Sequence, residues 1–579
     1  MINICKTDVL IVGGGGAGIR AALEASKNNA NVLLVLKGQI GKSGSSSSEL
    51  SEISGYNAYM GLDPNDSKDK FLEDILFAGE KTCDPDLAKV LVDKADDSVK
   101  DLENFGVDFE KKDDNYLFFK CCFSRNSRAL TLYRQGRKII EALGKEVRKN
   151  SKIKVIENLF IVDLIVNKNK CLGAIGIDKD KNIVVLQSKV TVLATGGFGA
   201  IFKNRIVPSD ITGDGHAMAL RAGCELINLE FFQMGFATLS PKLTLFESWL
   251  WGIYPIMKNG EGKEFLSDYL PEELSKKNAY STHSFHFPFS AEDNGKYLEI
   301  SAQSEVLKSK TSPNGGIYID FTFCDKKYLN ERFLENSYLK LFFEKSYQRL
   351  KKNSIDIFKK PMEVSVFSHA TNGGIKINTK AKSTVQNLFA VGEVSGGVHG
   401  ANRLGGNMLA TAQVFGKIAG FEAANICKNE NLYYDNETEK IIISHINSIL
   451  ARASDNEEDN LIEIMTKVKN MMSNTALIIR KEQSIQKGLE LLTNYKEILK
   501  SEIINSNHLF LAFTINNMID TGLAVLNAIL ERRESRGAHF RIDFPNKRKE
   551  YEKNLIIFRE NEVNNSKVKI ATKWIKLHK

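Results

Sequence analysis

One stretch near the start of the chain decides the fold: Asp8-Val9-Leu10-Ile11-Val12-Gly13-Gly14-Gly15-Gly16-Ala17-Gly18. It opens with an unbroken apolar run, which is typical of a parallel strand buried on both faces. Gly13, Gly15 and Gly18 have the spacing G-x-G-x-x-G, and residues 19–25 have the composition of a helix. Such glycines allow a tight turn, close approach of backbone N–H groups to a pyrophosphate, and close packing of helix on strand. The stretch therefore predicts a dinucleotide-binding site.

The residue that follows the second expected strand, residues 31–36, bears on which dinucleotide binds. An NAD site usually has Asp or Glu there for the ribose hydroxyls, whereas this chain has Lys37. Lysine disfavours NAD and leaves FAD, or NADP with Lys37 on its additional phosphate. Small polar residues follow at 38–48, and together with residues 54–58 they suit wrapping of a cofactor by backbone and hydroxyl hydrogen bonds.

The composition is that of an ordinary soluble protein with several domains. The chain has 579 residues, 42% of them hydrophobic and 26% charged, and a net charge of +8. Such a length corresponds to roughly two to four domains. Residues 541–579 contain eleven Lys/Arg and five Asp/Glu, a surplus of +6. A solvated tail accounts for this surplus, and the alternative is a patch that binds an acidic partner.

Other partners and locations are constrained by what the sequence lacks. Its eight cysteines form no C-x-x-C pair and no cluster with iron–sulfur or zinc spacing, so we expect no metal site. No interleaved basic and aromatic pattern indicates nucleic acid. No apolar run reaches the roughly 18 residues of a membrane span, and the first strand begins too near Met1 for a signal peptide. We therefore expect a cytoplasmic protein, unless a partner brings it to a membrane.

The remainder of the chain alternates between strand-like and helix-like segments. Residues 67–147 are expected to be mainly helical, and residues 154–166 and 171–186 to be strands of a meander. Residues 235–364 are aromatic-rich with few clear periods, which indicates an inserted domain. Residues 430–533 are charged and amphipathic, as in a helical domain.

A longer motif identifies a family resemblance. Residues 388–407 read Leu-Phe-Ala-Val-Gly-Glu-Val-Ser-Gly-Gly-Val-His-Gly-Ala-Asn-Arg-Leu-Gly-Gly-Asn. This closely resembles the signature of the succinate dehydrogenase/fumarate reductase flavoproteins, a group that includes L-aspartate oxidase and adenylylsulfate reductase. Further matches occur in family order at residues 13–18, 194–197, 212–215, 369–375 and 533–541. The resemblance covers nearly the whole chain.

The resemblance implies an α/β fold: a bipartite Rossmann-like FAD-binding domain, an inserted α+β capping domain and a C-terminal helical domain. The expected boundaries are 1–234 for the first part of the FAD-binding domain, 235–364 for the capping domain, 365–429 for the second part, 430–545 for the helical domain and 546–579 for a basic tail that forms a hairpin.

The resemblance also implies residues that hold FAD. Glu393 would accept hydrogen bonds from FAD hydroxyls, and Asp214, in a loop, would support the flavin side. Backbone groups from Asn407 to Leu409 would lie at the pyrimidine edge of the flavin. The full set of expected cofactor-binding residues is Gly13, Gly15, Gly16, Gly18, Lys37, Ser43, Gly44, Ser45, Asn57, Thr195, Gly196, Asp214, Glu393, Asn407 and Leu409.

Four residues are expected to be catalytic by the same resemblance. Arg403 would hold a substrate carboxylate in a bidentate fork, which suits a guanidinium, and His369 would hold the other end of the substrate. Lys277 aligns with the family arginine that delivers a proton to fumarate. Glu247 aligns with the glutamate of the proton relay, whose neighbouring arginine is missing here.

The chain departs from the family where succinate or fumarate would bind. Gly235 stands in place of a substrate-contacting histidine, and Trp249 and Trp251 appear in the relay motif. These changes favour a larger or more apolar substrate than a four-carbon dicarboxylate. An adenylylsulfate-like site also uses aromatic residues, so that alternative stays open.

These features predict an FAD-dependent oxidoreductase that transfers a hydride between flavin N5 and a carboxylate-bearing substrate. The reaction would be reduction of a C=C bond or dehydrogenation of a C–C or C–N bond, with electrons exchanged through an iron–sulfur partner subunit or a soluble carrier. The alternative is a flavin electron-transfer subunit whose catalytic site has decayed. An NAD(P)H:disulfide reductase is disfavoured because a second nucleotide fingerprint and a redox-active cysteine pair are missing.

We expect the FAD to be bound noncovalently. The family's covalent flavin link uses a histidine just after the second strand, and no histidine occurs between Met1 and Thr212. Acid precipitation of the purified yellow protein should therefore leave the flavin in the supernatant. Flavin that remained with the precipitated polypeptide would refute this prediction.

Overall fold

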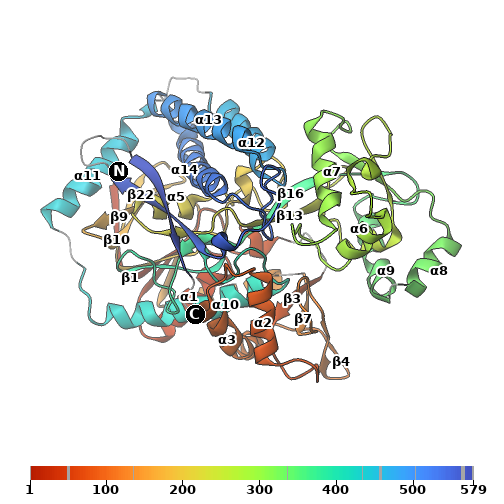
Figure 1. The fold of residues 1–579 in the computed structure, drawn as a ribbon. Helices are drawn as coiled ribbons and strands as arrows, with labels where there is room; N and C mark the ends of the chain where they lie inside the picture. Colours follow the sequence, from red (N-terminus) through yellow and green to blue (C-terminus); the bar gives the residue numbers. More distant parts are fainter. Residues whose placement is uncertain are drawn as a thin grey trace.

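The computed structural model describes residues 2–48, 53–134, 136–335, 337–432, 435–454, 460–502, 504–561 and 568–576 (Figure 1). A large body contains the main sheet and the C-terminal helices, and a smaller lobe of α6–α9 stands to one side (Figure 1). This arrangement confirms the α/β class and the FAD-binding, capping and helical parts expected from the sequence.

A seven-stranded sheet forms the centre of the body, in the order β8-β2-β1-β11-β10-β9, with β18 also paired to β11. Parallel pairing joins β8 to β2, β2 to β1, β1 to β11 and β11 to β18, whereas β9 and β10 are an antiparallel meander. The strands span Ile2–Val12 (β1), Val32–Val35 (β2), Ile153–Ile156 (β8), Leu159–Asn167 (β9), Lys170–Asp178 (β10), Ile183–Leu193 (β11) and Leu388–Ala390 (β18).

Two helices beside β1 approach each other closely at two glycines. They are α1 (Gly16–Lys27) and α10 (Asn407–Cys427). A Cβ added at Gly420 would lie 2.4 Å from the backbone oxygen of Ala21, and one added at Gly416 would lie 2.7 Å from that of Ala17. Because any side chain would push these helices apart, the two glycines of α10 fix its distance from α1.

The region between residues 67 and 147 is less helical than expected. It contains α2 (Lys68–Ala78), α3 (Pro85–Asn104) and α4 (Arg137–Lys149), but also a small antiparallel sheet. The strands of this sheet are β3 (Ile53–Asn57), β6 (Phe118–Phe119) and β7 (Ala129–Tyr133), with further short strands at β4 (Lys111–Lys112) and β5 (Asn115–Tyr116). These strands form because the buried backbone of β7 finds partners on β3, a segment distant in sequence.

The capping lobe is inserted between two antiparallel strands, β13 (Phe232–Thr238) and β16 (Met362–Thr371). The short strands β14 (Ile256–Lys258) and β15 (Ile317–Asp320) extend that sheet. Around it lie η3 (Ser248–Ile253), α6 (Lys276–His283), α7 (Lys296–Leu307), α8 (Lys326–Glu335) and α9 (Ser337–Lys352).

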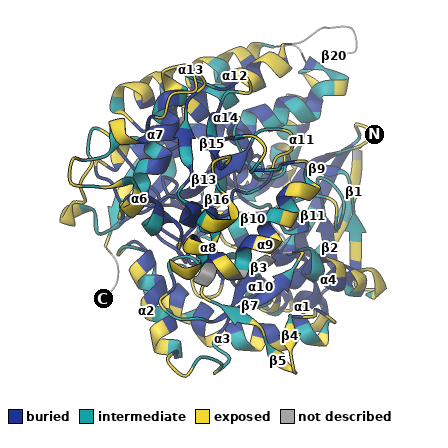
Figure 2. Ribbon diagram, turned by 90° about the vertical axis from the view of Figure 1, so that its right-hand side faces the viewer, coloured by how far each residue is buried: buried dark blue, intermediate teal, exposed yellow. Residues whose placement is uncertain are grey.

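The C-terminal helices are α11 (Asn436–Leu450), α12 (Leu461–Ala476), α13 (Glu482–Ser501) and α14 (Leu509–Glu531). Exposed residues lie on the outer turns of α12 and α13 (Figure 2). By length and composition residues 506–531 could cross a membrane, which corrects the expectation that no segment is long and apolar enough. Of the most apolar 18-residue window in this segment, 67% is buried inside the protein. We therefore interpret α14 as a core helix of this domain.

The basic tail, residues 541–579, was expected from the sequence to be solvated, but part of it packs against the body. β22 (Asn554–Asn561) and β23 (Val568–Ile575) form an antiparallel hairpin. The strand β22 also pairs with β12 (Leu226–Ile227), in a sheet completed by β17 (Gly374–Lys376) and β19 (Ser395–Gly396). Leu555, Ile556 and Ile557 are fully buried there. Burial of these apolar side chains holds the hairpin against the FAD-binding part.

Buried ion pairs join the end of α14 to the FAD-binding part. The Arg532 Nε donates to Glu230 Oε1 at 2.6 Å, and its Nη1 donates to Glu534 Oε1 at 3.0 Å. All three side chains are fully buried. Burial raises the pKa of Glu230, whereas Arg532 favours its charged form. Loss of the arginine would thus leave the buried Glu230 carboxylate without its main counter-charge, whereas Glu534 would keep its pair with Arg536.

We expect Arg532→Met to lower the free energy of unfolding by about 3–5 kcal/mol, the usual result of removing one partner of a buried pair. The matched control is Arg533→Met, because the neighbouring Arg533 is 51% exposed and pairs only at the surface with Glu482. Guanidinium unfolding followed by circular dichroism measures both. Equal shifts for the two variants would contradict the stabilising role of Arg532.

Candidate active site

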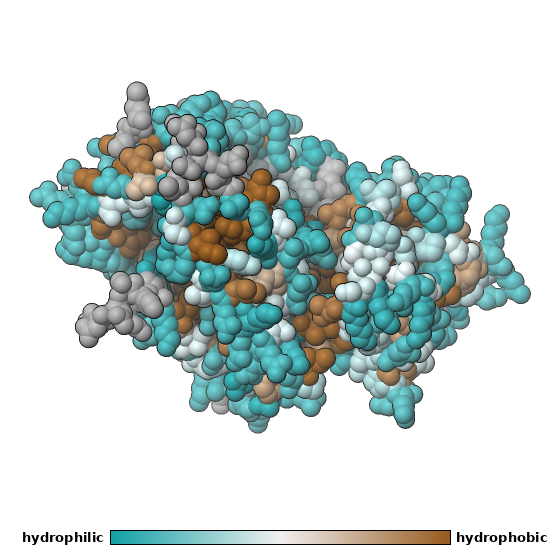
Figure 3. Space-filling view, turned by 90° about the horizontal axis from the view of Figure 1, so that it is seen from above, coloured by the Kyte–Doolittle hydropathy of each residue, from teal (hydrophilic) through white to brown (hydrophobic). Residues whose placement is uncertain are grey.

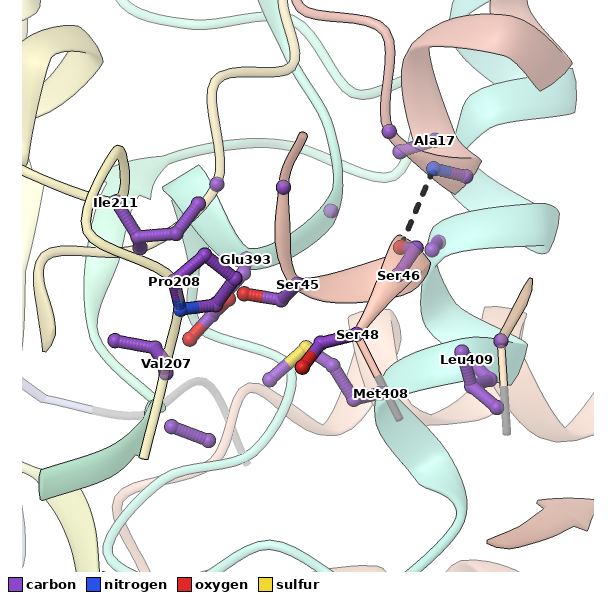
Figure 4. Close-up of a pocket in the computed structure, with 18 of the residues that line it drawn as sticks. Ala17, Ser45, Ser46, Ser48, Val207, Pro208, Ile211, Glu393, Met408 and Leu409 are labelled. Carbon is purple, nitrogen blue, oxygen red and sulfur yellow. Dashed lines mark hydrogen bonds between the residues drawn. The ribbon is translucent and has the colours of Figure 1, made fainter. Parts of the chain in front are cut away.

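A cavity of about 450 Å³ lies where the glycine loop, the residues after β2, the end of β11 and the start of α10 meet. Segments of the capping lobe form its remaining wall. Apolar side chains gather in the hollow between lobe and body (Figure 3). The residues drawn in Figure 4 come from both parts of the FAD-binding domain and point toward a common space. Nearly all the residues selected from the sequence line this cavity or support its wall.

The glycine loop is crowded at Gly13, Gly14 and Gly18 and open at Gly15. A Cβ added at Gly18 would lie 1.9 Å from the backbone oxygen of Gly13, and one added at Gly13 would lie 2.2 Å from that of Ala194. At Gly15, by contrast, the nearest atom is the Ser46 Oγ at 3.9 Å. Gly13 and Gly18 therefore permit helix–strand packing, while Gly15 leaves room on the cavity side, as a pyrophosphate would need.

Hydroxyl groups from the loop after β2, from β3 and from the end of β11 line the cavity. Gly16 N donates to Ser46 Oγ at 3.4 Å (Figure 4). The hydroxyls of Ser45, Ser54 and Thr195 line the cavity, are buried and have no hydrogen-bond partner among the described residues. Buried polar groups rarely stay unpaired, so these hydroxyls fit a polar ligand such as FAD. Ser46 and Ser54 were not selected from the sequence, although both lie in the polar stretches noted there.

Ser43 and Gly44 also line the cavity, but their polar groups shape the loop. The Ser43 hydroxyl donates to the backbone oxygen of Gln39 at 2.9 Å and accepts from Gln39 N at 3.1 Å. Gly44 N donates to Asp210 Oδ2 at 3.0 Å. These two residues therefore hold the loop against the cavity. Gly196 lines the cavity beside Thr195 at the end of β11.

Lys37 is charge-balanced by Asp214. Its Nζ lies 3.0 Å from Asp214 Oδ2, and Thr212 Oγ1 donates to the same oxygen at 3.0 Å. Asn517 Nδ2 donates to Asp214 Oδ1 at 2.9 Å. Asp214 is the first residue of α5 (Asp214–Arg221) and not a loop residue as expected. Since the Lys37 charge is already paired, the NADP alternative loses its proposed phosphate ligand.

Glu393 and the start of α10 form the opposite side of the cavity. Glu393 Oε1 accepts from Thr371 N at 3.0 Å, and burial raises the pKa of this carboxyl. Asn57 Nδ2 donates to Asn407 Oδ1 at 2.6 Å. These two asparagines do not line the cavity; they join β3 to α10 and so position Leu409, which does line it.

Arg403 is a buried cation that forms no direct ion pair with a described residue, although the Glu393 carboxylate lies near enough to favour its charged form. Its side chain lines the cavity, is 8% exposed as a residue, and forms no ion pair with any residue that the structure describes. Its Nη1 donates to the backbone oxygen of Leu404 at 3.1 Å, while its Nε has no partner among the described residues. Burial lowers the pKa of this guanidinium. A buried charge left uncompensated is costly, so the site is suited to binding an anion.

Two histidines beside Arg403 are neutral. Burial and the charge of Arg403 lower the pKa of His369 to about 3, and that of His399 to about 3 as well. His369 lines the cavity, and its Nδ1 has no partner within the described part of the chain. A neutral imidazole can donate or accept a hydrogen bond there without adding charge. His399 was not selected from the sequence, although it lies in the same signature as Arg403.

A phenyl ring fills the space that the missing histidine would occupy. The Phe287 ring lies so close to Gly235 that an added Cβ would be 2.7 Å from its Cζ. The same ring meets His369 edge-on, with 5.3 Å between ring centroids. Phe287 N also donates to Cys122 Sγ at 3.3 Å, which ties the lobe to the body. The wall is thus apolar here, and Gly235 is required by Phe287.

Glu247 lies on the cavity wall and pairs with an arginine from α9. Arg349 Nη2 lies 2.9 Å from Glu247 Oε1, and the Ser346 hydroxyl donates to Glu247 Oε2. Trp249 Nε1 donates to the same hydroxyl at 2.6 Å. The sequence analysis missed Ser346 and Arg349. Their spacing with Phe342, at i, i+4 and i+7, places all three on one helix face, but nothing in the sequence says what that face meets.

The structure corrects two expectations about the lobe. Lys277 lies on α6 and does not line the cavity; its side chain is 61% exposed and lies 3.4 Å from Glu335 Oε2. It is therefore not brought together with Arg403, His369 and Glu247. The two tryptophans also differ, because Trp251 is buried in the core of the lobe whereas Trp249 faces the cavity.

Comparisons with known proteins agree with this geometry. A family model described as FAD binding domain matches residues 8–409, and one described as Fumarate reductase flavoprotein C-term matches residues 465–579. An uncharacterized FAD-dependent oxidoreductase of Methanocaldococcus jannaschii is 35% identical, over 95% of this chain and 96% of that protein. A subunit of the fumarate reductase (CoM/CoB) of Methanothermobacter marburgensis is 32% identical, over 97% and 98%. The solved structure of Mycobacterium smegmatis Sdh1 in complex with UQ1 is similar with a TM-score of 0.84 at 27% identity, covering 100% of this chain and 95% of that one.

We expect Gly15→Val to prevent FAD binding without unfolding the protein. The open space around Gly15 can take a side chain, but that space is where the pyrophosphate must lie. Flavin absorbance per polypeptide measures the cofactor, and circular dichroism of the same sample measures the fold. Full FAD occupancy in this variant would mean that the cofactor is not held by the glycine loop.

Proposed function

This chain belongs to the succinate dehydrogenase/fumarate reductase flavoprotein family and is an FAD-dependent oxidoreductase, and from this premise we propose its reaction. The chain transfers a hydride between flavin N5 and a carboxylate-bearing substrate bound at Arg403. The observation that carries this proposal is the buried Arg403 guanidinium, which lines the cavity, forms no direct ion pair with a described residue and has an Nε without a described partner.

The cavity has the groups that a noncovalent FAD needs. The open Gly15 position and the unpaired hydroxyls of Ser45, Ser54 and Thr195 would hold its polar parts, and Glu393 would accept hydrogen bonds from its hydroxyls. When bound, FAD supplies the two-electron chemistry. The protein supplies binding, orientation and exclusion of water.

Arg403 would hold the substrate carboxylate by two parallel N–H donors. A guanidinium is planar and matches the two carboxylate oxygens, so it fixes both the position and the plane of the acid group. Neutral His369 would form a further hydrogen bond through its free Nδ1. Holding the reacting carbon in this way reduces the entropy that the reaction must lose.

The reaction would be reduction of a C=C bond, or dehydrogenation of a C–C or C–N bond, next to that carboxylate. Reduction places a hydride on one carbon of the double bond and a proton on the other. Glu247 remains our candidate for proton transfer because it lines the cavity and pairs with Arg349. Lys277 is withdrawn from this role because it lies outside the cavity.

Fumarate and succinate are disfavoured as substrates. Phe287 occupies the place of the substrate-contacting histidine. Lys277, which aligns with the family's proton-donating arginine, lies outside the cavity and cannot replace it there. We further propose that electrons pass to or from an iron–sulfur subunit or a soluble carrier in the cytoplasm. A relative named as one subunit of a fumarate reductase supports such a partner.

The Arg403→Lys variant tests the proposed clamp. Lysine keeps the charge but loses the fork, so substrate binding should weaken by about 2–5 kcal/mol while FAD content stays unchanged. The substrate for this test is the acid that most rapidly reoxidises the dithionite-reduced flavin in a panel of unsaturated acids. The exposed Arg533→Lys is the control. Wild-type kinetics in Arg403→Lys would exclude this arginine as the carboxylate site.

A further inference from the structure

We infer that the substrate is a monocarboxylate whose reacting bond carries an aromatic or similarly planar apolar group, and that Phe119, Trp249 and Phe342 bind this group. The inference rests on the proposed function and makes its substrate class specific. Two independent features of the cavity carry it: its balance of charge and its aromatic wall.

The cavity offers one cation to a substrate. Among the described residues that line it, the Lys and Arg side chains are Lys37 and Arg403. Lys37 is already paired with Asp214. Arg349 reaches Glu247 from behind the wall and is not itself part of the lining. A dicarboxylate would therefore leave its second carboxylate desolvated without a counter-charge, which is strongly unfavourable.

Three aromatic side chains lie together in the cavity wall, Trp249 and Phe342 from the lobe and Phe119 from the body. The Trp249 and Phe342 rings are stacked with centroids 4.9 Å apart and planes at 27°. The Phe119 ring meets Phe342 edge-on at 6.2 Å. These rings come from three segments of the chain, η3, α9 and β6, and all three line the cavity.

These aromatic rings are not simply core packing. Each of Phe119, Trp249 and Phe342 is only partly buried, whereas Trp251, two residues beyond Trp249, is 1% exposed within the lobe. Large apolar side chains that stay partly open inside a cavity can gain further burial from a ligand. A planar apolar group would provide it by stacking.

The wall is held in place before a ligand arrives. The Trp249 indole N–H is bonded to Ser346, and Ser346 in turn donates to Glu247. Phe119 packs on Gly55, where an added Cβ would lie 3.4 Å from its Cζ. Because these rings need little reordering on binding, an aromatic ligand loses less entropy here than on a flexible surface.

The experiment compares trans-cinnamate with fumarate. Both are trans-unsaturated acids, but cinnamate carries a phenyl ring where fumarate carries its second carboxylate. Binding to the oxidised FAD-containing protein is measured by isothermal titration calorimetry, with FAD content recorded for every variant. We expect cinnamate to bind at least about tenfold more tightly than fumarate. Phe342→Ala should weaken cinnamate by about tenfold, the scale of one lost aromatic contact, and leave fumarate unchanged.

Two further variants separate the possible outcomes. Glu344→Ala lies on an exposed face of α9 and should change neither affinity, while Phe342→Leu replaces Phe342→Ala if the latter loses FAD. Equal affinities for fumarate and cinnamate, or a cinnamate affinity that is unchanged in Phe342→Ala, would overturn the inference. The proposed function would still hold if binding of either acid depended on Arg403. Binding of both acids that is insensitive to Arg403→Gln would instead overturn the proposed function.

Discussion

The whole architecture depends on backbones that touch where no side chain can fit. Gly18 of α1 packs on the backbone of Gly13, and Gly416 and Gly420 of α10 pack on the backbone of α1. These contacts bring the first and second parts of the FAD-binding domain together, so that the loop before α1 and the loop before α10 face one cavity.

Short contiguous motifs could be interpreted from the sequence because their geometry is local. The strand–loop–helix order around Gly15 and the apolar strand before Glu393 both depend on neighbours within a few residues. The fold class and the placement of Arg403 and His369 in one site were implied by the family resemblance that these motifs carry, and both residues line the cavity. The expected site of FAD could be located for the same reason, since parallel strands end at one edge of a sheet.

The lobe wall could not be predicted in this way, because its contacts join segments far apart in the chain. The sequence showed that Gly235 stands where the family has a histidine. It did not show that the Phe287 ring fills the space of that histidine. The relay arginine was missing beside Glu247 in sequence, yet Arg349 reaches it from α9. Lys277 matched by alignment and lies outside the cavity. Only the packing of the lobe decides such pairings.

The central claim about this site is that Arg403, the cation among the described lining residues that forms no ion pair, faces an aromatic wall. The most direct measurement is a crystal structure of the FAD-containing protein with 3-phenylpropionate, the saturated product of cinnamate reduction. Our account predicts the carboxylate within hydrogen-bond distance of both terminal nitrogens of Arg403, and the phenyl ring against Trp249 and Phe342. A carboxylate bound elsewhere, or a ring directed away from these side chains, would contradict it.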